Sequence, residues 1–432
     1  MEKIHYHSAG IDIGSRKIFV GLENQPVRSF ETFTADLVAS KDYLLENKVN
    51  TVAMEATGVY WYVLYDILVD AGLDVWLVDG RQTRQLPGRK TDVKDCQWIQ
   101  QLHSYGLLNR CFVSEGLIKE LRSYQRLRED HLRSAATHVQ QMHKALIEMN
   151  IRLPEVLSQV HGASGMALVK AILAGERDPE KLISLCHVTV REKKGEELRK
   201  ALEGHYTEQG LFALRQAVKA YEFYQQQILD CDARIDAVLQ KINKDKTLPP
   251  GAGGGKRKAI RHNKPDIKGL GDHLLKIFGG RDATMLPGIT DYNWLQLYSE
   301  MGSDLSKWPS EKHFTSWLGL SPGQHNTGKT KKSKSKGKPI VGQIFKQMAH
   351  GLLNSKYIGF GAFARRLRGR KGPAVAIKAT ARKLAAQYWR LMVKGSEFVE
   401  QGIKVYEAII NQQKQRRLEK LALEFNMALV PA

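Results

Sequence analysis

The order of strand and helix patterns in the first 115 residues constrains the fold more than any other feature. Three strand patterns come first, separated by short turns, and strands and helices alternate after them. The strand patterns lie at residues 9–15, 17–23, 27–33, 50–55 and 74–79, and the helix patterns at 34–48, 59–72 and 91–106. The order β-β-β-α-β-α-β-α predicts a mixed sheet that begins with antiparallel hairpins and is covered by helices.

The rest of the chain has a helical pattern, which makes the fold class α/β plus α. Residues 117–151 and 210–242 each carry apolar residues at three- and four-residue spacing. Two such long helices, separated by a smaller helical segment, predict an antiparallel coiled-coil arm. We therefore expect four parts: an α/β domain at 1–115, a helical coiled-coil region at 116–244, a Pro/Gly/Lys-rich linker at 245–268 and a mainly helical domain at 269–432.

The formal charge of +21 and the pI near 9.6 raise the question of a polyanionic partner. The positive residues are clustered, and clustered Lys and Arg side chains release counterions from nucleic acid on binding. Three clusters stand out: Lys329, Lys331, Lys332, Lys334, Lys336 and Lys338; Arg365, Arg366, Arg368, Arg370 and Lys371; and Lys256, Arg257, Lys258 and Arg261. This clustering favours nucleic acid as the partner.

Other features exclude several classes of protein. The four cysteines are far apart and form no C-x-x-C motif, which argues against a zinc site or a disulfide framework and fits a reducing cytosol. The first residues, MEKIHYHSAGID, lack the apolar core of a signal peptide. No apolar run approaches the length of a membrane span. We expect a cytoplasmic protein with no membrane partner.

Residues 323–330, GQHNTGKT, match the phosphate-binding loop G-x-x-x-x-G-K-[ST] of nucleotide hydrolases. Such a loop follows a buried strand and opens a helix. Here Pro322 directly precedes the first glycine, and the basic stretch KKSKSKGKP follows. If the chain were a nucleotide hydrolase, it would bind ATP, and Lys329→Ala would abolish that binding. We expect the chain not to bind ATP.

Four carboxylates of the first domain occupy positions typical of a cation site. Asp12 lies in the middle of the first strand, where an acid is costly unless it is exposed or binds a cation. Glu55 ends the strand TVAME, and Asp92 and Asp95 share one face of the last helix of the domain. Each acid taken singly has a structural explanation, such as helix capping by Asp92 or pairing of Asp95 with Lys94. Together they are suited to hold hard divalent cations for phosphoryl transfer.

These motifs carry a resemblance to a known family. GIDIGS, VAMEATG and GRKTDVKDCQWIQQLHSYGLL resemble the RuvC-like domain, of ribonuclease H fold, of DEDD-type insertion-sequence transposases. This is insertion-sequence family one hundred and ten, the bridge-RNA-guided recombinases. The stretch at 143–179 is similar to the family's helical region, and MLPGIT, FTSWLGLSPGQHNTGKT and SKGKP are similar to its second, transposase-specific domain.

The resemblance implies roles for particular residues. Asp12, Glu55, Asp92 and Asp95 would form the DEDD tetrad that binds Mg²⁺ near the scissile phosphate. The family places a nucleophilic serine five residues after the proline of GL-x-P, and this chain has Thr327 at that position. Ser333 and Ser335 lie nearby as substitutes. Apart from the resemblance, His325 lies near Thr327 in the sequence and is either a general base or a solvated loop histidine.

The resemblance also implies partners. They are double-stranded DNA of the target and of the donor element ends, a structured guide RNA, and further copies of the chain in a homodimer or homotetramer. Guide pairing would leave the protein to contact phosphate backbones without reading bases. The residues expected to do so are Arg89, Lys90, Lys329, Lys331, Lys332, Lys334, Lys336, Arg365, Arg366 and Arg368. Lys256 to Arg261 are either an RNA contact or part of a soluble linker.

Two further interpretations stay open. A RuvC-like metal-dependent DNA junction endonuclease would use water as the nucleophile on the same fold, and it would survive Thr327→Val. A covalent recombinase would lose strand exchange in that variant. A non-catalytic nucleic-acid-binding protein with a degenerate site would retain its function in Asp12→Asn.

Overall fold

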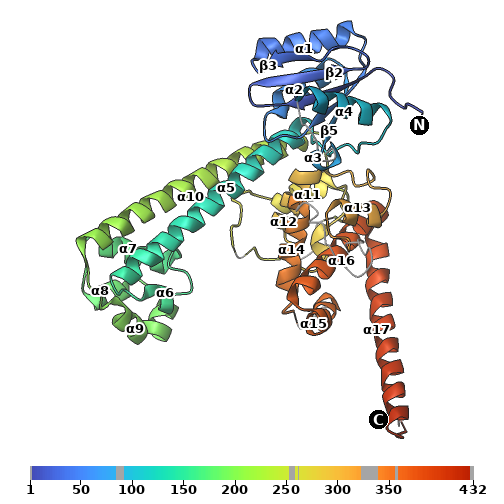
Figure 1. Cartoon of the computed structure of the whole chain (residues 1–432). Helices are drawn as coiled ribbons and strands as arrows, with labels where there is room; N and C mark the ends of the chain where they lie inside the picture. The colour runs from blue at the N-terminus through green and yellow to red at the C-terminus, as the bar shows by residue number, and fades with distance from the viewer. Residues whose placement is uncertain are drawn as a thin grey trace. The chain divides into compact units, whose positions relative to one another are not determined.

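The structure is a computed structural model that describes residues 2–83, 92–252, 258–260, 262–322, 339–355 and 359–428. Its chain forms two compact units, residues 1–113 and residues 114–432. Figure 1 shows the first unit in blue and the second in colours from green to red. The two units are described in turn.

The first unit contains a five-stranded sheet in the order β3-β2-β1-β4-β5. The strands are β1 (Ser8–Ile13), β2 (Lys17–Leu22), β3 (Arg28–Glu31), β4 (Thr51–Glu55) and β5 (Asp74–Val78). The first three strands pair antiparallel, and β4 and β5 pair parallel to β1 and β4 respectively. The prediction of a mixed sheet that begins with antiparallel hairpins is therefore confirmed.

Helices cover both faces of this sheet, because its strands are apolar on both sides. On one face, Ile11, Met54 and Leu77 form a common core with α1 (Thr34–Glu46) and α2 (Trp61–Asp70). On the other face, Ala53 and Val78 pack against Ile99 of α4 (Asp92–Ser104). Successive side chains of a strand point to opposite faces. Asp12 follows Ile11 and Glu55 follows Met54 along their strands, so these two side chains point to the opposite face and toward α4.

Two glycines allow α4 to approach the sheet closely. A Cβ atom added at Gly10 of β1 would lie 2.2 Å from the backbone nitrogen of Gln100 and 2.3 Å from the carbonyl oxygen of Cys96. One added at Gly21 of β2 would lie 3.0 Å from the Cys96 carbonyl carbon. Any larger residue at Gly10 must push the helix backbone away from the strand. The short distance between α4 and β1 therefore depends on Gly10 and Gly21 having no side chain.

The second unit is helical and begins with two long helices, α5 (Gly116–Glu148) and α10 (Glu208–Ile242). They run antiparallel and side by side (Figure 1), since Arg128 pairs with Asp232 near one end and Met149 meets Gly210 near the other. Between them in the sequence, four shorter helices form a small apolar core at that far end. They are α6 (Leu153–Val156), α7 (Ala163–Leu173), α8 (Pro179–Ser184) and α9 (Val188–Leu202).

The remaining helices form a larger core that also includes residues of α5 and α10, among them Leu121 and Ile235. Large aromatic side chains are fully buried in it, including Trp294, Phe345 and Tyr388. The elements are α11 (Leu270–Ile277), the 3-10 helix η1 (Ala283–Met285), α12 (Asp291–Met301), α13 (Glu311–Trp317), α14 (Ile340–Leu352), α15 (Gly359–Lys371), α16 (Pro373–Lys394) and α17 (Ser396–Glu424).

A buried ionic network fixes the long helices to α12. The Arg128 guanidinium donates to Asp232 at 2.5 Å and to the Tyr292 hydroxyl at 2.8 Å, and both charged side chains are almost completely buried. Tyr292 in turn donates to Glu129 at 2.5 Å. Losing one partner of a buried ion pair leaves an uncompensated charge, which destabilises by about 3–5 kcal/mol. The network therefore makes the helix pair and the C-terminal helices one packed body.

The structure leaves parts of the sequence interpretation as predictions. The antiparallel pair of long helices is present, but its description as a coiled-coil arm stays a prediction, as do the domain bounds at 115, 244 and 268. Within the described residues, no helix combines the length and the apolar character that crossing a membrane requires.

The close contact of α4 with β1 predicts the effect of adding one methyl group. We expect Gly10→Ala to lower the free energy of unfolding of the first unit by about 1–3 kcal/mol, because overpacking forces backbone shifts. Gly21→Ala meets the same helix at 3.0 Å and should lower it less. Urea unfolding followed by circular dichroism measures both, and a Gly10→Ala protein as stable as the wild type would show that α4 does not lie this close.

Candidate active site

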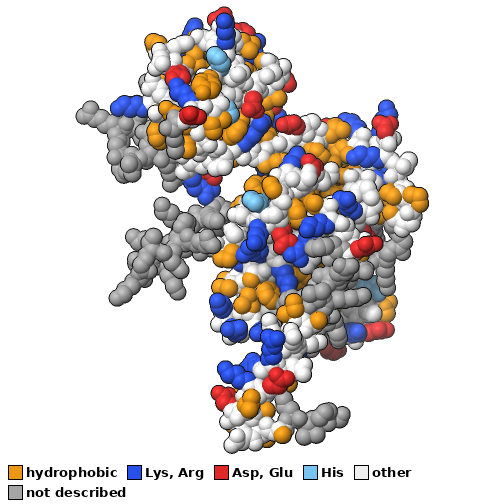
Figure 2. Space-filling view, turned by 90° about the vertical axis from the view of Figure 1, so that its right-hand side faces the viewer, with side chains coloured by type: hydrophobic (Ala, Val, Ile, Leu, Met, Phe, Trp, Pro, Cys, Tyr) orange, Lys and Arg blue, Asp and Glu red, His pale blue; other side chains and the backbone are white. Residues whose placement is uncertain are grey.

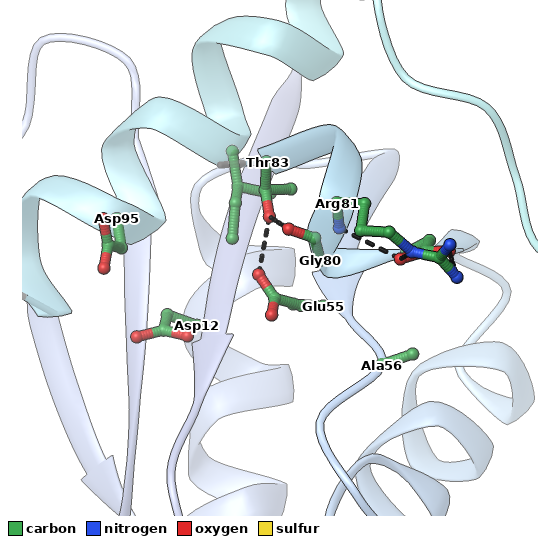
Figure 3. Close-up of a pocket in the computed structure, with 9 residues that line it drawn as sticks. Asp12, Glu55, Ala56, Gly80, Arg81, Thr83 and Asp95 are labelled. Carbon is green, nitrogen blue, oxygen red and sulfur yellow. Dashed lines mark hydrogen bonds and ion pairs between the residues drawn. The ribbon is translucent and has the colours of Figure 1, made fainter. Parts of the chain in front are cut away.

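Three of the four predicted carboxylates, Asp12, Glu55 and Asp95, line one cavity of about 480 Å³ in the first unit. They come from β1, β4 and α4, three elements widely separated in the sequence. Figure 3 shows their carboxyl groups around a common space, with Asp95 on the helix and the other two on the sheet. The sequence placed these acids on separate elements, and the structure brings them together.

The strand register accounts for the first pair. Ile11 of β1 lies beside Met54 of the parallel strand β4, so the next residues along the two strands, Asp12 and Glu55, are also neighbours. Both side chains leave the face that α1 and α2 cover, since Ile11 and Met54 are buried in that core. The two carboxylates therefore project together from the face that packs against α4.

The helix α4 supplies the third carboxylate. Its backbone at Cys96 lies over Gly10 and Gly21, which brings the preceding residue, Asp95, to the cavity. Asp92 is the first residue of α4, but its side chain lies outside what the structure describes. The predicted position of Asp92 one helical turn before Asp95 agrees with the helix bounds, and its contribution to the cavity stays a prediction.

Glu55 is held by residues that the sequence did not single out. The Thr83 hydroxyl donates to Glu55 Oε2 at 2.6 Å (Figure 3) and also lies 3.2 Å from the carbonyl oxygen of Gly80. A Cβ at Gly80 would lie 2.3 Å from Glu55 Oε1, so the carboxylate occupies the space that a side chain would fill. Gly80–Thr83 form the short helix α3.

The cavity carries an excess of negative charge. Among the described residues, four carboxylates line it, those of Asp12, Glu55, Asp79 and Asp95, against a single cation, Arg81. Arg81 pairs with Asp79 at 3.0 Å, and Figure 3 shows its side chain directed away from the other three acids. Burial, followed by the nearby charge of Asp12, raises the pKa of the Cys96 thiol to about 12. This thiol therefore stays neutral beside the acids.

The other predicted site residues are placed less completely. Arg365, Arg366 and Arg368 lie exposed on α15, in the second unit. Lys258, from the third basic cluster, donates to the carbonyl oxygens of Thr284 and Leu286, so it stabilises the protein's own loop. The remaining predicted residues lie outside the described ranges: Thr327, Arg89, Lys90, Lys329, Lys331, Lys332, Lys334 and Lys336.

Comparison with known families decides the identity. Residues 9–151, which contain all four predicted acids, match a transposase family of the IS110 DEDD type. Residues 282–357 match the transposase family IS116/IS110/IS902. The chain belongs to the IS110 family of DEDD transposases. A search of curated proteins finds no match to the chain.

Membership of this family defines the general chemistry. A transposase is an enzyme that processes DNA, so DNA is a partner of this chain. The DEDD type of transposase domain indicates dependence on a divalent metal ion. In the acidic cavity of the first unit, several carboxylates from the matching region line a common space.

The hydrogen bond from Thr83 to Glu55 predicts the behaviour of two variants of this transposase. Thr83→Val keeps the shape of the side chain but removes the donor, so Glu55 loses its fixed orientation. We expect DNA strand cleavage to fall about 10–100-fold, as for other residues that orient a metal-binding side chain. Thr83→Ser keeps the hydroxyl and should retain most of the activity. Equal losses in the two variants would indicate a packing role instead.

Proposed function

We propose that this transposase cleaves and exchanges DNA strands with Mg²⁺ held by Asp12, Glu55, Asp92 and Asp95. The observation that carries the proposal is the convergence of three of these carboxylates on one cavity. We also propose that the first unit is a RuvC-like domain of ribonuclease H fold. Its strand order, with three antiparallel strands followed by two parallel ones, supports this assignment.

The residues of the cavity suit a hard divalent cation in their chemistry. The candidate ligand atoms are oxygens, those of four carboxylates and of the Thr83 hydroxyl, and among the described lining residues the negative charges exceed the positive one. Among the described residues, no three His, Cys, Asp or Glu side chains are grouped closely enough to hold an ion. Mg²⁺ does not need such a cage, because it commonly binds one or two carboxylates and completes its shell with water and phosphate oxygens.

The chain's own residues then have separate tasks in the proposed reaction. Asp12 and Glu55 project from a rigid sheet, and Thr83 keeps the Glu55 carboxylate in one orientation. Asp95 faces them from α4, so the phosphate enters between a sheet and a helix of fixed separation. When bound, Mg²⁺ would supply charge stabilisation for the phosphate as it is attacked.

For the nucleophile we propose the hydroxyl of Thr327. Its attack on the scissile phosphate would link the enzyme to DNA, so that the later transfer to another strand needs no external energy. Ser333 and Ser335 are the alternative hydroxyls. Water is the nucleophile in the second candidate function, a RuvC-like junction endonuclease. The observation that favours it is the threonine at the position where the family has serine.

We propose that a structured guide RNA selects the DNA and that the enzyme works as a homodimer or homotetramer. The exposed arginines of α15 support a role in binding phosphate backbones, since Arg and Lys contacts to phosphate carry no sequence information. The long pair α5 and α10 offers an extended surface for a second copy of the chain.

The acidic cavity predicts the effect of neutralising single carboxylates. Asp12→Asn and Asp95→Asn should each lower metal-dependent strand cleavage about 100-fold or more, because the charge stabilisation supplied by a metal ion is worth several kcal/mol. Asp70→Asn, at the exposed end of α2, is the matched control and should cleave like the wild type. Cleavage of labelled DNA with and without EDTA is the measurement. Full activity of Asp12→Asn would rule out the proposed site.

Trapping with DNA distinguishes an enzyme hydroxyl from water as the nucleophile and identifies which hydroxyl reacts. With a suicide DNA substrate, we expect a covalent protein–DNA adduct that mass spectrometry maps to Thr327 and that Thr327→Val abolishes. An adduct at Ser333 or Ser335 would move the nucleophile to that residue. Cleavage without any adduct, unchanged in Thr327→Val, would favour the junction endonuclease.

A further inference from the structure

The positive charge of the chain is concentrated in one stretch. Residues 312–396 contain 19 Lys and Arg and no Asp or Glu, whereas the whole chain has a net charge of +21. The described parts of this stretch include α14, α15 and α16. Figure 2 shows Lys and Arg side chains distributed over the surface of the C-terminal helices. A surface of this kind attracts a polyanion along its whole length.

Within this stretch, α16 forms one wall of a cavity of about 690 Å³ in the second unit. Its size is typical of sites that hold a small molecule, about 300–1,000 Å³. The apolar part of its lining comes from Leu320, Pro322, Phe363, Ala374, Val375, Ala379 and Ala386. This cavity is separate from the acidic one, and nothing in the proposed reaction uses it.

Cations surround the apolar lining. Lys378, Arg382 and Lys383 of α16 lie on the same face as Ala379 and Ala386, at three- and four-residue spacing. The only acid in the lining is Glu311, which the fourth cation, Arg390, binds through both carboxylate oxygens. The cavity therefore combines an apolar interior with an excess of positive charge.

The position of Lys383 favours an anion in this cavity. Its Nζ lies 4.8 Å from the centre of the Phe363 ring and 5.7 Å from that of Phe360. Burial, and next the charge of Arg390, lower the pKa of Lys383 to about 8. A bound anion would oppose both effects, because a nearby negative charge stabilises the ammonium form of the lysine.

We propose that this cavity binds one unpaired nucleotide of a DNA strand, with the base against the apolar wall and Phe363 and the phosphate beside Lys378 and Arg382. A base in a duplex presents only its edges, whereas an unpaired base exposes an apolar face that fits such a wall. Aromatic and apolar side chains combined with cations are how proteins hold single strands. The inference rests on the proposed function in one respect, that the strands are opened for exchange.

One residue that lines the cavity is close in the sequence to the proposed nucleophile. Pro322 contributes to its lining, and Thr327, the proposed nucleophile, follows five residues later. A nucleotide bound beside Pro322 would restrain the strand on which that residue is proposed to act. Strand exchange requires the two broken ends to be kept apart from their former partners, and a pocket for an unpaired nucleotide does this.

The test compares two oligonucleotides with equal charge. A fluorescent ten-nucleotide dT strand and an otherwise identical strand of abasic residues are titrated with the full chain in EDTA, and anisotropy is followed. We expect the wild type to bind the dT strand about tenfold or more tightly than the abasic strand, because base stacking adds to the phosphate contacts. Ala379→Phe fills the cavity without changing its charge and should abolish this difference.

Two further variants separate the cavity from general electrostatics. Lys378→Gln with Arg382→Gln should weaken binding of both strands. Lys414→Gln with Arg416→Gln removes the same charge from exposed positions of α17 and should weaken binding less, with the preference for dT retained. Equal weakening by the two double variants, or a preference that survives Ala379→Phe, would overturn the proposal.

Crosslinking locates the base even where a variant folds poorly. A dT strand that carries 5-iododeoxyuridine should crosslink to Phe363 of the wild type on irradiation. A crosslink mapped only to other residues, or tighter binding of a uridine RNA strand than of the DNA strand, would overturn the assignment. Since EDTA removes the metal and strand cleavage from the assay, loss of cleavage with an intact dT preference would count against the proposed function alone.

Discussion

The candidate active site depends on the close approach of α4 to the sheet over Gly10 and Gly21. Without side chains at these positions, the helix backbone lies directly on β1 and β2, and the carbonyl oxygen of Cys96 occupies the place of a Cβ at Gly10. This contact sets the distance between a carboxylate on the helix and two on the sheet. A helix packed over larger residues would lie farther out, and Asp95 would then no longer share a cavity with Asp12.

The same geometry places several carboxylates around one cavity, and a bound cation would reduce the repulsion between them. Three acids from different elements face one another, and the one lining cation, Arg81, is paired with Asp79. Like charges that line one cavity repel one another. Burial, and next the charge of Asp12, raise the pKa of the neighbouring Cys96 thiol. A divalent ion relieves this repulsion, which is a physical reason to expect metal binding to rigidify the first unit.

Much of the fold was predictable because it follows from local patterns. Runs of apolar residues mark the strands of the first unit, and apolar residues at three- and four-residue spacing mark its helices. Asp12 stands out because it is an acid within an apolar strand. The contacts that complete the site are not local. Thr83 reaches Glu55 across 28 positions of the sequence, and nothing in either segment signals that hydrogen bond. The buried Arg128–Asp232 pair and the cavity beside α16 likewise arise only when distant helices pack.

The separation of charge along the chain has a functional reason. Lysines and arginines beside the acidic cavity would pair with its carboxylates, as Arg81 does with Asp79, and would compete with a metal ion for them. An acid among the cations of residues 312–396 would compete with phosphate in the same way. Among the described residues, the acids of the cavity and the cations of residues 312–396 belong to different units, so the two sets do not pair within one unit.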